Sequence, residues 1–183
     1  KAWHKVLDTL HMLDYLLNTT TSSEDSDINS DLQILQSALE SLFKNTHLWP
    51  DSTLLDLVSA LGQLTLEFME TLATAEKKLT GIKVFGLEKM LVVAQINLDR
   101  ITLFWEMLAA YLDCICNSKY SEIRVLGIQS LSEILIKVFK HFIDYPPPPE
   151  TEKWRNWQRT LFLSLHDLSC SGFSDTKEAV FQA

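Results

Sequence analysis

The sequence predicts an all-α protein, and three observations support this class. Apolar residues recur at helical spacing along most of the 183 residues. Glycine and proline are scarce, with five of each, and four of the prolines stand in one run, which leaves few turns for a strand-rich fold. The most strand-like run, Leu91-Val92-Val93, is short and lies inside a helical period, so we predict no strand.

The N-terminal part predicts two helices with an acidic segment between them. Residues 2–17 are amphipathic, with leucines at helical spacing. Residues 19–30 are rich in Ser, Thr, Asp and Glu, and we expect them to form a flexible acidic loop. A second apolar period covers residues 31–44.

The remainder of the chain predicts further helices separated by short breaks. These helices cover residues 51–77, 84–97, 99–117, 121–142 and 151–169. The proline run makes residues 145–150 a loop, because proline cannot continue a helix. The run could be a ligand for an aromatic-groove domain, but a rigid spacer between helices is the favoured interpretation.

A polar joint, Asn97-Leu98-Asp99-Arg100, separates two of these helices. Asparagine tolerates the left-handed conformation that often ends a helix, and the short carboxylate of Asp99 can cap the next one. Arg100 would then lie in a first turn, where the helix dipole disfavours a cation, so we expect it to have a carboxylate or carbonyl partner. Asn97 and Arg100 could instead bind an acidic partner protein, but an architectural role is favoured.

The segment around this joint also resembles a known family. The family pattern is Phe-Gly/Ser-Leu-x-Lys-Leu, then Asn-x-x-Arg-Ile and a Trp four residues after the Ile. The matching residues here are Phe85, Gly86, Leu87, Lys89, Asn97, Arg100, Ile101 and Trp105, with Met90 in place of the last Leu of the opening. The pattern is similar to the helical region downstream of the catalytic domain in the large Golgi Arf guanine-nucleotide exchange factors. It is most similar to their non-catalytic branch, the monensin-sensitivity Golgi scaffolds, and the match runs from about position 40 to 143.

A weak internal echo supports a repeat architecture. Ser121-Glu122-Ile123-Arg124 and Ser174-Asp175-Thr176-Lys177 have the same order of cap, acid and base before an apolar face. The second helix of a HEAT or armadillo unit often begins in this way, and such units stack helix pairs. Together with the resemblance, the echo predicts an α-solenoid of HEAT/armadillo-like helix pairs with about seven or eight helices. Residues 1–183 would be one helical-repeat segment of a larger protein.

Charge and composition exclude several function classes. The net charge is −8 and the lysines and arginines are scattered, whereas nucleic-acid binding concentrates them. No apolar run reaches the ~20 residues of a membrane span. Motifs for nucleotide loops, zinc sites and catalytic triads are missing from the sequence. Cys114 and Cys116 would point roughly 200° apart on a helix, so they would not share a metal ion. With the missing motifs, this predicts no metal site, no cofactor and no catalytic residue.

Aromatic residues give two further expectations. Trp105 should form a core face with Phe104 and Leu108. Trp154 and Trp157 follow the proline run beside basic residues, and they could form an exposed partner surface or anchor a helix in the core.

The resemblance implies a function that composition alone does not. It implies a non-enzymatic scaffold segment of a large cytosolic protein that regulates vesicular traffic at the Golgi, the trans-Golgi network or endosomes. Arf-family GTPases and other trafficking scaffolds would be its protein partners, and membrane association would be peripheral and through the whole protein. The alternative is the regulatory helical region of a true Arf exchange factor. A small helical enzyme is a third class, but the sequence offers it no polar constellation.

Overall fold

The computed structural model describes residues 2–20, 26–74, 84–146, 152–169 and 173–174. Within these ranges the regular structure is helical throughout and contains no strand. The elements are α1 (Ala2–Thr20), α2 (Ser26–Lys44), the 3-10 helix η1 (Asn45–Leu48), α3 (Asp51–Thr74), α4 (Phe85–Ile96), the 3-10 helix η2 (Leu98–Leu103), α5 (Trp105–Cys116), α6 (Ser121–Asp144) and α7 (Glu152–Ser169). The predicted all-α, solenoid-like class with about seven or eight helices is confirmed.

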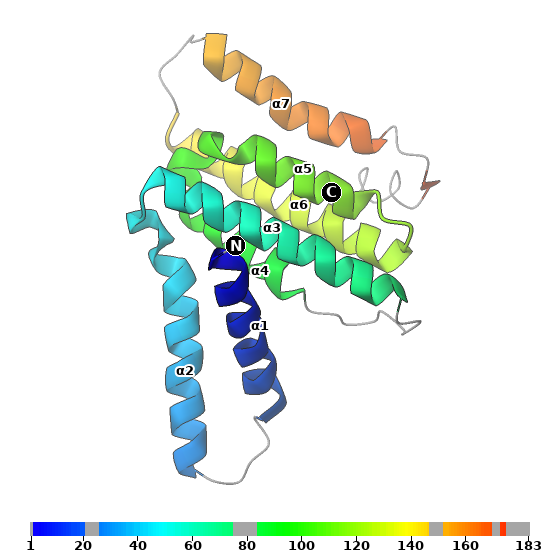
Figure 1. Cartoon of the computed structure of the whole chain (residues 1–183). Coiled ribbons are helices and arrows are strands. Elements are labelled where there is room, and N and C mark those ends of the chain that lie inside the picture. Colours follow the sequence, from blue (N-terminus) through cyan, green and yellow to red (C-terminus); the bar gives the residue numbers. More distant parts are fainter. Residues whose placement is uncertain (1, 21–25, 75–83, 147–151, 170–172, 175–183) are drawn as a thin grey trace. The chain divides into compact units, whose positions relative to one another are not determined.

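The chain divides into two compact units. Unit 1 comprises residues 1–68 and 83–97, and unit 2 comprises residues 69–82 and 98–183. In unit 1, α1 and α2 lie side by side and run in opposite directions, and in unit 2 the same is true of α5 and α6 (Figure 1). Antiparallel neighbours joined by short connections are the building blocks of helical repeats.

The core of unit 1 forms where α2, α3 and α4 bury their apolar stripes. The rings of Phe43 and Phe85 meet edge to face, with centroids 6.1 Å apart. Gly86 allows α4 to approach α3 closely, since a Cβ at this position would lie 2.8 Å from the carbonyl oxygen of Leu61 and would also clash with the Thr65 hydroxyl. The fully or almost fully buried apolar residues of this core include Leu39, Phe43, Leu54, Leu57, Val58, Leu61, Val84, Phe85, Leu87, Met90 and Val93.

The core of unit 2 is built on the crossing of α5 and α6. Gly127 makes this crossing tight, because a Cβ there would lie 2.8 Å from the Ile115 side chain and 2.9 Å from the Cys116 backbone nitrogen. The expected core face is confirmed, since Phe104, Trp105 and Leu108 are buried. Other buried residues of this core are Ile101, Leu112, Ile115, Cys116, Ile123, Ile128, Leu131, Ile134, Leu135, Val138 and Leu161.

The predicted acidic loop over residues 19–30 is longer than the break in the structure. Helix α1 continues to Thr20 and α2 already begins at Ser26, while residues 21–25 lie outside the described part. The positive end of the helix dipole favours carboxylates in the first turn of a helix in general. The acidic composition of residues 19–30, which we interpreted as a loop, is therefore also compatible with the start of a helix at Ser26.

The polar joint after α4 also differs from the prediction. Asn97 does end α4, but its φ of −112° is not left-handed. The predicted helix over 99–117 begins only at Trp105, because residues 98–103 form the 3-10 helix η2, with a kink at Arg100. Asp99 is therefore not the cap of α5. Its side chain is 94% exposed and its carboxylate lies 3.4 Å from His141 Nε2.

Two further expectations concern the ends of α6 and α7. Helix α6 ends at Asp144, and only residues 145 and 146 of the predicted loop 145–150 are described. The second copy of the internal echo begins at Ser174, and its remaining residues lie outside the described part. Among the helices that are described, none is long and apolar enough to cross a membrane.

Candidate functional site

The residues of the Val84–Trp105 pattern lie mostly inside the two cores. The apolar members Phe85, Leu87, Ile101 and Trp105 are between 0 and 4% exposed. Asn97 is 2% exposed, and Lys89 and Arg100 are half-buried. Their positions favour the architectural interpretation over a binding pair.

Asn97 connects two helix ends in unit 1 through a buried polar network. Its side-chain amide donates hydrogen bonds to the Thr46 hydroxyl at 2.9 Å and to the Val93 carbonyl at 2.7 Å. The Thr46 hydroxyl in turn donates to the Phe43 carbonyl at 2.8 Å. Buried polar groups are stable only when they are paired, so this chain of bonds fixes the end of α4 against η1.

The ammonium group of Lys89 lies near two aromatic rings that contact each other. Its Nζ lies 5.8 Å from the ring centre of Phe43 and 5.5 Å from that of Phe85, within the range of a cation–π contact. Glu40 lies nearby on α2. The hydrogen bond from Lys44, at 2.9 Å, and the charge of Lys44 lower the pKa of the Glu40 carboxyl, and the charge of Lys89 adds to this effect.

Arg124 is a buried charged residue that the sequence analysis named in the internal echo but did not predict to be buried. It is 7% exposed and donates a hydrogen bond to the Ser118 carbonyl at 2.9 Å. Its guanidinium group lies 4.0 Å from the ring centre of Phe173. The sequence signal for this residue was a base three positions after the helix start at Ser121. Its hydrogen bond to Ser118 stabilises the turn between α5 and α6.

The groups that could carry chemistry are dispersed. His4 lies 3.1 Å from Glu67, and His11 stacks on Phe85 with ring centres 5.3 Å apart. Cys114 is exposed and Cys116 is buried, so the two thiols point apart as expected. Within the described residues, no three His, Cys, Asp or Glu side chains are placed to hold a metal ion.

Burial controls the chemistry of Cys116. Removal of its thiol from water, with a smaller contribution from the charge of Asp113, raises the pKa of Cys116 to about 12. A thiol with this pKa stays protonated at neutral pH, and a protonated thiol is a poor nucleophile and metal ligand.

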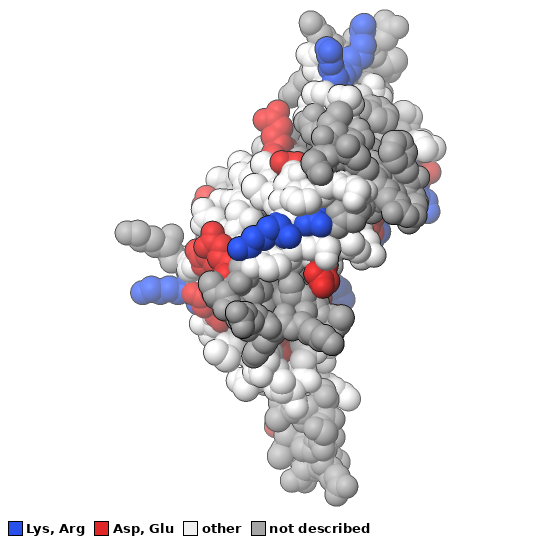
Figure 2. All heavy atoms as spheres, turned by 90° about the vertical axis from the view of Figure 1, so that its right-hand side faces the viewer, with Lys and Arg blue, Asp and Glu red and all other residues white. Residues whose placement is uncertain are grey.

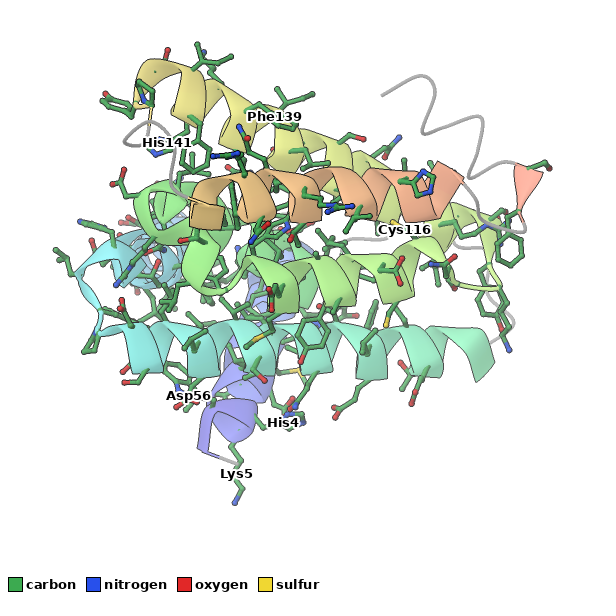
Figure 3. All side chains as sticks on the ribbon, turned by 90° about the horizontal axis from the view of Figure 1, so that it is seen from above. His4, Lys5, Asp56, Cys116, Phe139 and His141 are labelled. Atoms are coloured by element: carbon green, nitrogen blue, oxygen red, sulfur yellow. The ribbon has the colours of Figure 1, made fainter. Side chains whose placement is uncertain are left out.

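The candidate site is an apolar pocket in unit 2, which we call the Trp157 pocket. Its volume is about 320 Å³. The lining residues come from the end of α6, the start of the proline run and the middle of α7, and they are Phe139, Phe142, Ile143, Pro146, Trp157, Gln158 and Leu161. Figure 3 labels Phe139 and His141 on α6.

Trp157 forms the inner wall of this pocket. Its ring lies 6.4 Å from that of Trp105 and 4.9 Å from that of Phe142, both edge to face. At the mouth, Ile143 is 78% exposed. Trp157 is half-buried, so it both packs against the core and faces the pocket. The side chain of Trp154, the other predicted partner residue, lies outside the described part.

The described surface carries charges of both signs. On the face in Figure 2, Lys and Arg side chains form separate small groups with Asp and Glu nearby. This arrangement agrees with the scattered charges of the sequence and differs from the continuous basic stripe of a nucleic-acid interface.

Comparison with known proteins finds similarity over almost the whole chain. The chain is 26% identical to Protein MON2 homolog of Xenopus laevis over 92% of its length. It is 27% identical to the proteins of the same name from Drosophila melanogaster and Homo sapiens, over 97% and 83% of its length. No family model and no solved structure matches the chain. The chain spans about a tenth of the length of these curated relatives, so the similarity is to one region of the MON2 homologues.

Proposed function

We propose that this chain is a non-enzymatic helical scaffold segment of a large cytosolic protein that regulates Golgi and endosomal vesicular traffic. The observation that carries the proposal is the similarity to three MON2 homologues along most of the chain. The all-α architecture fits this role, because stacked helices provide long surfaces on which several proteins can assemble.

The positions of the pattern residues support a scaffold role over an active site. Asn97 and Lys89 serve packing within unit 1, and Trp105 lies inside the core of unit 2. The Trp157 pocket is lined by aromatic and aliphatic side chains and by a single amide, that of Gln158. Such a lining suits recognition of an apolar group, whereas catalysis needs convergent polar or ionisable groups.

The partners and the location follow from the same resemblance. We propose Arf-family GTPases and other trafficking scaffolds as partners of the whole protein. It would associate peripherally with membranes of the Golgi, the trans-Golgi network or endosomes. The alternative is that the region belongs to a true Arf exchange factor and regulates a catalytic domain elsewhere. This alternative is supported by the pattern from Val84 to Trp105, which resembles the exchange factors as well as their non-catalytic branch.

Nucleotide exchange tests the non-enzymatic assignment. Exchange requires an acidic residue that reaches the nucleotide phosphates and displaces Mg²⁺. We expect that the purified chain, in excess, leaves the rate of mant-nucleotide release from a panel of Arf-family GTPases at its intrinsic value. Clear acceleration with any member would place the chain among exchange factors and refute the scaffold assignment.

Microscopy of the tagged full-length protein tests the location. We expect its fluorescence to coincide with Golgi or endosomal markers and to be released to the cytosol by mild salt extraction of membranes. A uniform cytosolic or nuclear distribution would contradict the trafficking role.

A further inference from the structure

The Trp157 pocket lies in a basic part of an acidic chain. Between Lys137 and Leu161 the sequence contains five lysines and arginines and three acidic residues, a net charge of +2, while the whole chain carries −8. A local charge of opposite sign to the whole molecule attracts ligands that the rest of the surface repels. The ligand class that fits this contrast is acidic.

Two exposed arginines on α7 flank the pocket residue Gln158. Arg155 and Arg159 are exposed and one helical turn apart. At 100° per residue, Arg155 lies about 60° and Arg159 about 100° around α7 from Gln158, on the side away from the other lining residues Trp157 and Leu161. A ligand that leaves the pocket across Gln158 would therefore reach Arg155 first and Arg159 after it. Neither arginine forms an ion pair with another side chain in the described part of the structure.

Helix α6 contributes a third cation. Lys140 is exposed and precedes the lining residue Ile143 by three positions, which places the two on one side of the helix. Lys137 differs, since it already pairs with Glu133 at 3.0 Å. We call Lys140, Arg155 and Arg159 the basic rim. Two exposed acids lie near it: Asp144, and Asp99, whose carboxylate is 3.4 Å from His141 Nε2.

The size of the pocket limits what can enter it. Its volume of about 320 Å³ is near the lower end of the roughly 300–1,000 Å³ range of ligand pockets. This space takes one or two large side chains. The exposure of Ile143, 78%, shows that the mouth is open to solvent, so the remainder of the ligand can continue across the surface toward the basic rim.

We propose that the Trp157 pocket binds a short acidic segment of a partner protein. The segment inserts one or two large apolar side chains against Trp157 and Phe142, and its carboxylates pair with the basic rim. The apolar insertion provides the affinity, because it removes aromatic surface from water. The charges orient the segment and select against basic or neutral sequences. The inference rests on the proposed scaffold function and specifies the chemistry of one partner.

Fluorescence anisotropy with labelled peptides tests the proposal. The probe is a ten-residue peptide with a Phe-x-x-Leu core flanked by Glu and Asp. Two matched peptides replace the acids with Gln or replace Phe and Leu with Ser. We expect the purified chain to bind the first peptide at least about tenfold more tightly than either matched peptide, a difference of about 1.4 kcal/mol. Its affinity should fall as salt is raised.

Matched variants locate the binding. Ile143→Glu should weaken binding of the acidic peptide about tenfold or more, while Ile136→Glu should not, because Ile136 is 59% exposed on the same helix but does not line the pocket. The double variant Arg155→Glu with Arg159→Glu should weaken binding, and the exposed Lys5→Glu in unit 1 should not. Thermal melts followed by circular dichroism check that each variant is folded.

Three outcomes would overturn the proposal. The first is equal binding of the acidic and glutamine peptides, and the second is unchanged binding by folded Ile143→Glu. The third is a chain that binds no peptide but self-associates until Ile143→Glu separates it, which would assign the pocket to a second copy. The exchange assay is independent of these results, so failure of the peptide proposal leaves the scaffold function intact, and accelerated exchange refutes that function whatever the peptides do.

Discussion

The two units share a close helix contact at a glycine, Gly86 in unit 1 and Gly127 in unit 2, but they differ in the groups that surround it. Unit 1 places polar and charged groups at its helix contacts, with Asn97 hydrogen-bonded to Thr46 and Lys89 beside the rings of Phe43 and Phe85. Unit 2 relies on a close apolar crossing, where Gly127 admits the backbone of Cys116 and Trp105 is fully buried. The difference shows that a conspicuous polar residue in a sequence pattern can be part of the architecture, while the accessible apolar surface lies elsewhere.

The contrast between Trp105 and Trp157 gives the largest expected effect. Trp105→Ala should cost about 3–5 kcal/mol, as for other buried aromatic residues. Trp157 is half-buried, so Trp157→Ala should cost less, on the order of 1–2 kcal/mol. Urea unfolding followed by far-ultraviolet circular dichroism measures both. Equal losses would mean that the Trp157 pocket is as much a part of the core as the α5–α6 crossing.

Trp105→Phe is the matched control for that prediction. The Trp105 indole nitrogen is buried and has no hydrogen-bond acceptor within the described residues. A buried donor without an acceptor carries a desolvation cost of about 1–3 kcal/mol. Phenylalanine keeps most of the aromatic packing and removes this donor, so Trp105→Phe should be much milder than Trp105→Ala. Similar losses in both variants would assign the indole nitrogen a hydrogen-bond partner.

The glycines at the helix crossings make a prediction with a definite sign. Gly→Ala inside an exposed helix should stabilise it by roughly 1 kcal/mol. At Gly127 the added Cβ would meet the Cys116 backbone nitrogen at 2.9 Å, and overpacking of this kind costs about 1–3 kcal/mol. Gly127→Ala should therefore lower the melting temperature, and Gly86→Ala should do the same in unit 1. A rise in melting temperature for either variant would show that the crossing is looser than described.

The polar network of unit 1 should have a measurable coupling energy. Asn97→Ala should cost about 1–3 kcal/mol, because the Thr46 hydroxyl loses a donor in a buried site. A double-mutant cycle with Thr46→Val isolates this interaction. We expect a coupling of about 0.5–1.5 kcal/mol. A coupling near zero, or loss of partner binding with an unchanged melting temperature, would restore the binding interpretation of Asn97.

The sequence predicted the helices better than the connections between them. The apolar period identified α4 and α6 almost to the residue, because burial of one face determines both the period and the fold. The start of α2 was missed, although Ile28, Leu32 and Leu35 continue its helical spacing. The acidic residues were interpreted as a solvated loop, and the same residue types are favoured in the first turn of a helix.

The joint and the pocket show where sequence reasoning ends. Asp99 has the right chemistry for a cap, but the chain forms the 3-10 helix η2 there, and Asp99 lies beside His141. Nothing in the spacing of residues 97–105 distinguishes these outcomes. Trp157 was a candidate from its position after the prolines, but Phe142 and Pro146 join it only through the packing of α7. Such a pocket is a tertiary property that local patterns do not contain.

The smallest expected effect concerns Cys116, which lies at the α5–α6 crossing. The accessibility of its thiol measures how often this crossing opens. Its pKa is raised to about 12 by burial, while an unfolded thiol titrates near ~8.5. The folded state therefore holds the proton more tightly than the unfolded state. Its contribution to stability is complete below about pH 8.5 and is lost as pH rises toward 12.

Labelling kinetics measure this directly. The double variant Cys114→Ser with Cys170→Ser leaves Cys116 as the sole thiol of the chain. At pH 8 we expect 5,5′-dithiobis(2-nitrobenzoate) to react with this variant slowly in buffer and rapidly in denaturant, whereas a variant that retains only the exposed Cys114 should react rapidly in both. Slow labelling that follows the stability of the fold would show that Cys116 becomes accessible only when the crossing opens. Rapid labelling of Cys116 in buffer would mean that α5 and α6 separate readily, and the apolar crossing at Gly127 would then not hold unit 2 together.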